Sequence, residues 1–177
     1  MKKSEYKFFA GFENSPYSLE ERGIETDDFT KSLGLLIIAF SDLENELEIL
    51  IHKLIGIDTE IGTILTAELS YRNKVTLIAS LMKKKRNSIN ENIDPEFIDE
   101  FIEEFIKMLF KCEELRNQLT HSFYLDNNNN GAIRIKVSAK SSGYKRIEEK
   151  IETSFILDVY DFIVSSKMYV EDIIVNK

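Results

Sequence analysis

The sequence predicts a mainly α-helical protein: a bundle of about five helices with a small antiparallel β-hairpin inserted before the last helix. Two observations predict this class. Apolar residues recur at spacings of three and four over most of residues 26–119 and again after Ser154, whereas between residues 122 and 150 the spacing changes to two. A chain of 177 residues is long enough to bury one substantial core, so we expect a single domain over residues 1–177, with residues 1–25 as an irregular N-terminal arm.

The first half of the chain predicts three helices. Residues 26–55 are expected to form one long helix, because aspartates occupy its first turn and an apolar stripe follows at helical spacing. Asp58 or Thr59 can cap a shorter helix that runs to about Leu69, and a third helix is expected over residues 71–86. The stripe of the first helix consists of Phe29, Leu33, Leu36, Phe40, Leu43, Leu47, Leu50 and Leu54.

A second long helix follows a polar loop at residues 87–92. Asp94, Pro95 and Glu96 mark its start with an N-cap aspartate, a proline at the first helical position and an acid in the first turn. Its apolar stripe is widened on one flank, which suggests one contact with its own core and another with a further helix or subunit; a two-fold interface there brings the Arg116 side chains of two copies together. The stripe consists of Ile98, Phe101, Phe105, Met108, Cys112, Leu115 and Leu119, and the flank of Ile102, Ile106 and Leu109.

The predicted β insertion lies between this helix and the last one. Apolar and polar residues alternate from Ile133 to Lys140, and turn-forming residues at 126–131 and 141–143 bound that run. Residues 122–150 are therefore expected to form the antiparallel hairpin insertion. From Ser154 helical spacing returns on a face so apolar that it must be buried.

The formal net charge of −8 argues against nonspecific coating of nucleic acid, since affinity for phosphate backbones comes mainly from clustered lysine and arginine. The positive charges are nevertheless grouped. Residues 71–86 carry six basic and no acidic side chains, and residues 131–150 carry six basic and two acidic ones. These segments can meet an anionic partner locally, although Lys83–Arg86 is equally well explained as a solvated helix end.

The sequence predicts a cytoplasmic protein with no membrane span. Its longest apolar run, residues 33–40, is far shorter than the roughly 20 residues that cross a bilayer, and the run at residues 8–10 is too short for a signal-peptide core. Cys112 is the only cysteine, so we expect neither a disulfide nor a zinc cluster within one chain. The sequence also has no Gly-rich phosphate loop and no nucleophile elbow, and no cofactor or metal is predicted.

Residues 116–121, RNQLTH, hold the candidate catalytic residues Arg116, Asn117 and His121. Cleaving RNA without a metal needs one group that stabilises charge on the phosphate and another that moves protons. Arginine suits the first task because its planar fork binds two phosphate oxygens, and histidine suits the second because it titrates near neutral pH; the amide can orient either by hydrogen bonding. Arg116 and His121 are roughly 140° apart around an ideal helix, so the length of the arginine or a helix end near Thr120 has to bring them together.

The string Arg116-Asn117-Gln118-Leu119-Thr120-His121 resembles the Arg-x(4 to 6)-His motif of the HEPN superfamily. Proteins of that superfamily are compact helical bundles with the motif near the end of a late long helix, and the resemblance extends from about Phe29 to Ile174. It implies metal-independent endoribonuclease activity in a toxin–antitoxin, abortive-infection or other phage-defence setting. It also implies a homodimer that joins two motifs in one cleft. The expected partners are therefore RNA, a second copy of the chain and an antitoxin protein.

The resemblance also implies a role for each motif residue. Arg116 stabilises the phosphorane-like transition state, His121 handles the proton, and Asn117 supports both. Members paired with a nucleotidyltransferase antitoxin carry tyrosine two residues after the histidine. Here that position is Phe123, and Tyr124 comes next, which weakens the expectation of regulation by nucleotidylation but leaves the nuclease core untouched.

Other interpretations stay open. The cleft can belong to a non-catalytic HEPN-like module that binds nucleotide, RNA or a partner protein, which the net charge of −8 favours. The chain can also be a helical interaction protein whose last helix serves only for dimerisation. A purely structural interpretation of the motif has Arg116 paired with Glu113, one turn back, and His121 bound to the last carbonyls of the helix.

Three further features have structural interpretations. The acid-rich segment DLENELE, residues 42–48, is expected to be a solvated helix face, although Glu44 or Glu48 can neighbour the site. His52 is expected to be a packed or interfacial histidine rather than a ligand. Cys112 is expected in the core, since a free cysteine behaves as a small apolar residue.

Overall fold

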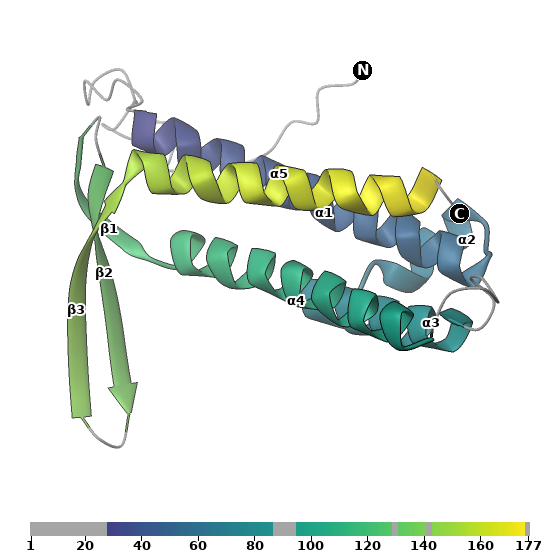
Figure 1. Ribbon diagram of the computed structural model, residues 1–177. Helices are drawn as coiled ribbons and strands as arrows, with labels where there is room; N and C mark the ends of the chain where they lie inside the picture. Colours follow the sequence, from purple (N-terminus) through teal and green to yellow (C-terminus); the bar gives the residue numbers. More distant parts are fainter. Residues whose placement is uncertain (1–27, 87–94, 129–130, 141–142, 176–177) are drawn as a thin grey trace, which may run out of the picture.

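A small sheet stands across one end of a group of helices (Figure 1). The computed structural model describes residues 28–86, 95–128, 131–140 and 143–175. These ranges hold five helices and three strands, which confirms the predicted class of a helical bundle with a small antiparallel sheet before its last helix. In chain order the elements are α1 (Asp28–Ile55), α2 (Thr59–Thr66), α3 (Tyr71–Lys85), α4 (Pro95–Thr120), β1 (Phe123–Asn128), β2 (Gly131–Lys140), β3 (Gly143–Glu152) and α5 (Thr153–Val175).

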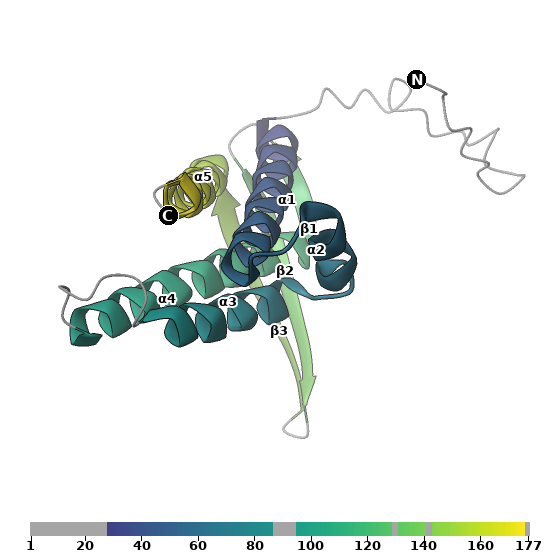
Figure 2. The same cartoon turned by 90° about the vertical axis from the view of Figure 1, so that its right-hand side faces the viewer.

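The other helices pack around α1. It lies along α5 and contacts α2, α3 and α4 on its other sides (Figures 1 and 2). Its predicted stripe explains this position, because residues three and four apart share one face of a helix and burying that face removes apolar surface from water. The helix ends at Gly56, whose φ of 76° costs glycine little. Its buried apolar residues are Phe29, Leu36, Ala39, Phe40, Leu43, Leu47, Leu50, Ile51 and Leu54.

The wide apolar face of α4 lies inside the chain. Ile102 and Leu109 of the predicted flank are 1% and 0% exposed, and the buried Tyr71 of α3 donates a hydrogen bond from its hydroxyl to the carbonyl of Leu109 at 3.1 Å. Ile102 and Leu109 therefore belong to the core of the chain and not to a two-fold interface. The sequence pattern shows that a face is apolar, but it does not show that α1, α3 and α5 of the same chain pack against α4.

Most predicted boundaries agree with the structure to within a residue or two. An exception is α2, which ends at Thr66 rather than Leu69, because the chain turns there to begin α3. Ser70 caps α3, and its hydroxyl accepts a hydrogen bond from the backbone N–H of Asn73 at 3.3 Å. The predicted N-terminal arm, the loop at residues 87–92 and the cap at Asp94 lie outside the described residues.

The insertion is a three-stranded meander in the order β1-β2-β3, rather than a simple hairpin. β3 extends to Glu152, and α5 begins at the next residue. The base of the β2–β3 ribbon is anchored in the core through the paired residues Ala132 and Ile151, which are 2% and 4% exposed. The far end of the ribbon projects away from the helices (Figure 1).

The basic run at the end of α3 lies far from the RNQLTH motif. The two helices are antiparallel, since Arg72 pairs with Glu113 and Arg86 pairs with Asp99. Asp99 is 17 residues before Arg116, which corresponds to about 25 Å along α4. The exposed lysines 83–85 are therefore a helix end remote from the candidate site.

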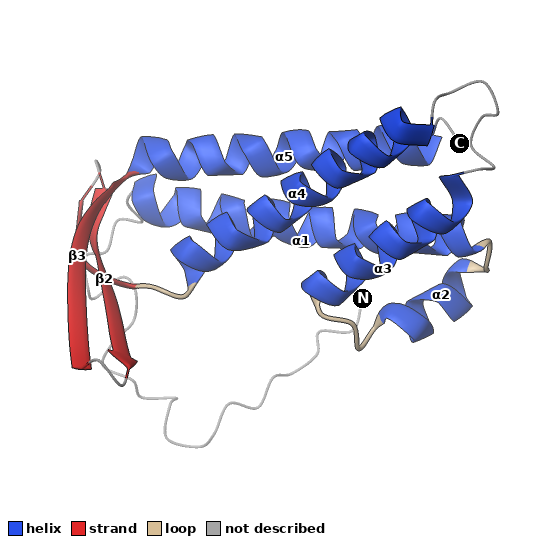
Figure 3. Cartoon of the chain, turned by 60° about the horizontal axis from the view of Figure 1, so that its bottom comes forward, coloured by secondary structure: helices blue, strands red, loops and turns tan. Residues whose placement is uncertain are grey.

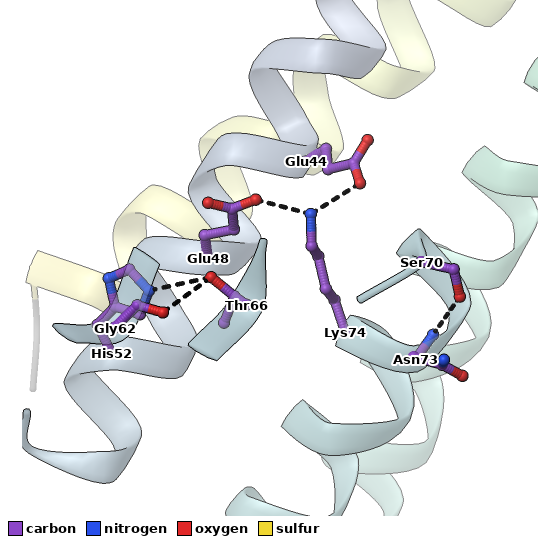
Figure 4. Close-up of polar contacts among 8 residues, drawn as sticks. All are labelled: Glu44, Glu48, His52, Gly62, Thr66, Ser70, Asn73 and Lys74. Carbon is purple, nitrogen blue, oxygen red and sulfur yellow. Dashed lines mark hydrogen bonds and ion pairs between the residues drawn. The ribbon is translucent and has the colours of Figure 1, made fainter. Parts of the chain in front are cut away.

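His52 is buried where α1 meets α2, which confirms that it is a packed histidine. Its Nε2 lies 3.4 Å from the hydroxyl of Thr66, and that hydroxyl donates to the carbonyl of Gly62 at 3.0 Å (Figure 4). Since the hydroxyl proton is used, Nε2 is the protonated ring nitrogen and the donor to Thr66. The imidazole therefore presses directly against the backbone of α2.

We expect Gly62→Ala to destabilise the protein by about 2 kcal/mol, the usual size of an overpacking penalty. A Cβ at this position lies 2.4 Å from Cδ2 of His52, so α2 or the imidazole has to move. Urea denaturation measures the change in the free energy of unfolding. Gly34→Ala is the matched control, because a Cβ there meets nothing within 4 Å, and it should be neutral or slightly stabilising. Equal effects of the two substitutions contradict this account of the α1–α2 contact.

Candidate active site

The motif lies at the end of α4 that faces the sheet (Figure 3). α4 ends at Thr120, and the backbone N–H of His121 still donates to the carbonyl of Asn117 at 3.2 Å. His121 therefore continues the helical path for one more residue before the chain turns into β1. The sequence predicts that either a helix end near Thr120 or the length of the arginine brings Arg116 and His121 together, and α4 does end there.

The last carbonyls of α4 accept hydrogen bonds from groups other than the His121 side chain. The carbonyl of Gln118 accepts from the Ser122 hydroxyl at 2.7 Å and from the Arg134 guanidinium at 3.0 Å, and the carbonyl of Leu119 accepts from the Tyr124 hydroxyl at 2.7 Å. Carbonyls at a helix end need such partners. Because these side chains supply them, the exposed imidazole of His121 is not the group that caps the helix.

The guanidinium of Arg116 is half-buried and held in one orientation. Its Nη1 donates to the side-chain oxygen of Asn117 at 2.7 Å, and its Cζ lies 4.3 Å from the centre of the Phe40 ring. Glu113 pairs instead with Arg72 of α3, at 3.4 Å. The pairing of Arg116 with Glu113, on which the structural interpretation of the motif depends, is therefore not the one in the structure.

Two hollows meet at His121. The first, which we call the α1 hollow, has a volume of about 260 Å³ and lies between α1 and the end of α4. The second, the sheet groove, has a volume of about 540 Å³ and lies between the end of α4 and β2. The α1 hollow is lined by Ile37, Phe40, Ser41, Glu44, Arg116, Thr120 and His121, and the sheet groove by Glu114, Asn117, Gln118, His121, Ser122, Arg134, Ile135, Lys136 and Val137.

The structure thus brings all three motif residues to one place. Arg116 lines the α1 hollow, Asn117 lines the sheet groove, and the hydrogen bond between their side chains joins the two. His121 lines both and is exposed. A ligand that occupies both hollows lies beside the imidazole.

Arg134 is a contributor that the sequence did not reveal. The alternating pattern predicted it on a solvated face of β2, yet it is 7% exposed and forms an ion pair with Glu149 of β3. Its second contact, to the carbonyl of Gln118, ties the sheet to the motif helix. Buried arginines need partners of this kind, and no spacing rule shows that the partner is a helix end 16 residues away in the chain.

Glu44 and Glu48 are half-buried, and Glu44 neighbours the site, which the sequence left open for both residues. Both accept hydrogen bonds from the buried ammonium of Lys74 in α3, at 2.8 and 2.7 Å (Figure 4). Burial alone lowers the pKa of Lys74, but the two hydrogen bonds outweigh it and raise that pKa above the ordinary lysine value. Lys74 therefore stays charged, and Glu44 is held at the wall of the α1 hollow.

Tyr124 and Cys112 have structural roles. The Tyr124 hydroxyl caps α4, its ring packs edge-on against Phe29 at 5.1 Å, and burial raises its pKa. The residue two positions after His121 is Phe123, which is exposed. Cys112 lies in the core, as predicted, where burial raises the pKa of its thiol to about 11.

No family model, no curated protein and no solved structure matches the chain. Among the helices that the structure describes, none is long and apolar enough to cross a membrane. Within the same described ranges, no group of three or more His, Cys, Asp and Glu side chains is placed to hold a metal ion. The functional assignment therefore depends on the geometry around His121.

Proposed function

We propose that this protein is a metal-independent endoribonuclease that cleaves RNA through the RNA's own 2′-hydroxyl. The observation that carries this proposal is the position of His121 on the rim of two adjoining hollows, with Arg116 in one and Asn117 in the other. These residue types supply the two functions that the reaction needs, charge stabilisation and proton transfer.

Arg116 stabilises the charge that develops on the phosphate. Its contacts with Phe40 and Asn117 hold the guanidinium in place before substrate arrives, so little reorganisation accompanies the reaction. His121 transfers a proton, and its exposure leaves both ring nitrogens accessible to substrate. Asn117 orients the arginine.

The two hollows fit the two sides of a scissile phosphate. The α1 hollow, at about 260 Å³, has room for a phosphate with part of its ribose, and the sheet groove, at about 540 Å³, is in the range of pockets that hold a nucleotide-sized ligand. Lys136 lines the sheet groove and is exposed, whereas the charge of Arg134 is offset by Glu149. A single strand or loop of RNA, whose bases are unstacked, suits such an open groove.

The resemblance to the HEPN motif supports a setting in toxin–antitoxin or phage-defence systems, with an antitoxin protein as a partner. It also supports a homodimer. One exposed apolar face beside the site is on α1, where Ile37 and Ile38 are 49% and 60% exposed and Ile37 lines the α1 hollow. A second copy that covers these isoleucines brings its own Arg116 and His121 toward the first pair.

A non-catalytic module that binds nucleotide, RNA or a partner protein is the second candidate. The acidic side chains Glu44 and Glu114 in the two hollows favour its protein-binding form, because they oppose the entry of phosphates. Binding without strand cleavage is its signature.

The test is to incubate the protein with a structured RNA in excess EDTA and to map the ends of the products. We expect 2′,3′-cyclic phosphate and 5′-hydroxyl ends, because the 2′-oxygen is the nucleophile. The same RNA with a 2′-deoxynucleotide at the cleavage site should be bound and left intact. A preparation of His121→Ala, purified in parallel, controls for contaminating ribonuclease. Cleavage of DNA of the same sequence at a comparable rate excludes this mechanism, and RNA binding without cleavage favours the second candidate.

Lys136→Ala should raise KM for RNA several-fold and leave kcat nearly unchanged, because Lys136 binds substrate at a distance from the reacting atoms. The dependence of binding on salt should weaken by about 0.7 in log–log slope, the value of one lost phosphate contact on a single strand. Fluorescence anisotropy at several salt concentrations measures this slope. Lys145→Ala, an exposed lysine of β3 beyond the groove lining, is the matched control. Equal effects of the two variants show that the sheet attracts RNA only through its overall charge.

A further inference from the structure

We propose that Glu44 is a second catalytic residue of this site and acts as the general base that takes the proton from the 2′-hydroxyl of RNA, while His121 acts as the general acid. The inference rests on the proposed ribonuclease activity. The motif contains one group that can transfer a proton, His121, and the inference assigns a second proton transfer to Glu44 of α1.

The chemistry requires two proton transfers. As the bond between the 2′-oxygen and phosphorus forms, the 2′-hydroxyl loses its proton, and as the bond between phosphorus and the 5′-oxygen breaks, the leaving oxygen gains one. In this scheme the Glu44 carboxylate accepts the first proton, and the His121 imidazolium donates the second. The products are a 2′,3′-cyclic phosphate, a 5′-hydroxyl, a neutral carboxylic acid and a neutral imidazole. Proton exchange with water then restores both side chains.

The position of Glu44 fits this role. Glu44 of α1 and His121, the first residue after α4, line the same hollow, with Arg116 as a further lining residue. Only one carboxylate oxygen, Oε1, accepts the hydrogen bond from Lys74, and Figure 4 shows the other oxygen turned away from the ammonium. Lys74 therefore fixes the carboxylate by one oxygen and leaves the second to meet a substrate hydroxyl.

Positively charged neighbours of Glu44 offset the repulsion between its carboxylate and a bound phosphate. Lys74 of α3 and Arg116 of α4 are its positive neighbours, and Glu48 of α1 is the negative one. Tyr71 of α3 is neutral, because burial raises its pKa. Among the described residues that line the hollow, His121 is the remaining titratable group.

Glu48 provides a matched control for Glu44. It accepts from the same ammonium, and the side chains of Glu44 and Glu48 are similarly exposed, at 30% and 23%. Glu48 lies one turn further along α1, beyond the lining of the α1 hollow. Glu44→Gln and Glu48→Gln therefore remove similar ion pairs, and only the first removes a group from the candidate site.

The experiment uses an RNA oligonucleotide and a copy with sulfur in place of the 5′-oxygen at the cleaved bond, each with the full-length protein in EDTA. A thiolate leaves without needing a proton, so loss of a general acid is tolerated on the sulfur substrate and loss of a general base is not. We expect Glu44→Gln to be about 100-fold slower than wild type on both substrates. His121→Ala should be slow on the ordinary RNA and recover most of the wild-type rate on the sulfur RNA. Glu48→Gln should stay close to wild type on both.

A Glu44→Gln variant that matches Glu48→Gln on both substrates overturns the inference, for instance because His121 of a second copy is the base. In that case wild-type cleavage leaves the proposed function standing. If the wild-type protein does not cleave RNA, both proposals fail together.

Discussion

His121→Ala is expected to slow RNA cleavage at neutral pH on the order of 1,000-fold, the middle of the range for loss of a proton-transfer group. The free energy of unfolding should change little, since the imidazole is exposed and the helix carbonyls beside it are bound by other side chains. Single-turnover rates on a saturating RNA measure the first quantity, and urea denaturation measures the second. Loss of activity without loss of stability is the result that marks a chemical role.

The second histidine of the chain provides the contrast. His52 is buried against α2, so His52→Ala should lower stability and, at temperatures where the variant stays folded, retain the rate of RNA cleavage. If His121→Ala keeps near wild-type activity, the proton-transfer assignment is wrong. If it loses stability instead, the imidazole is a structural group.

Arg116→Ala is expected to reduce kcat by about 100- to 1,000-fold, the usual cost of removing one preorganised group that stabilises transition-state charge. Arg116→Lys should recover little of this loss. Lysine carries a point charge, whereas the planar guanidinium lies over the Phe40 ring and donates to Asn117 at the same time. The comparison of kcat for the two variants on one RNA tests whether geometry or charge alone matters.

Arg72 is a matched control for Arg116. Its guanidinium also lies over a phenylalanine ring, 5.2 Å from the centre of Phe110, and it pairs with Glu113. These contacts join α3 to α4, and none of the three residues lines either hollow. Arg72→Ala should therefore cost less than about 1 kcal/mol of stability, as exposed ion pairs do, and leave kcat unchanged. Equal losses of activity in the two arginine variants point to a general effect of net charge.

Much of the fold follows from sequence spacing. The repeat of Leu36, Leu43, Leu47 and Leu54 is enough to predict one long buried helix, because a helix places residues three and four apart on one face. The change to a period of two after His121 likewise predicts the sheet and its place before α5. The motif could also be found from sequence. The chain has six arginines and two histidines, so few arginine–histidine pairs can have this spacing near the end of a predicted helix.

Spacing does not show which element covers which face. The flank of α4 at Ile102 and Leu109 reads equally well as core or as interface, and only the packing of α1 and α3 assigns it to the core. In the same way the sequence places Arg134 on an outer face of a strand, whereas the structure buries it between Glu149 and the end of α4.

The sequence by itself determined the helices, the inserted sheet and the RNQLTH motif, because each depends on residues close together in the chain. The tertiary structure decided the rest of the site. Glu44 is 72 residues before Arg116, yet both line the α1 hollow, and Lys74, 30 residues after Glu44, donates a hydrogen bond to the Glu44 carboxylate. Contacts of this kind arise from how α1, α3 and α4 pack, and helix packing depends on the shape of whole faces rather than on any local pattern.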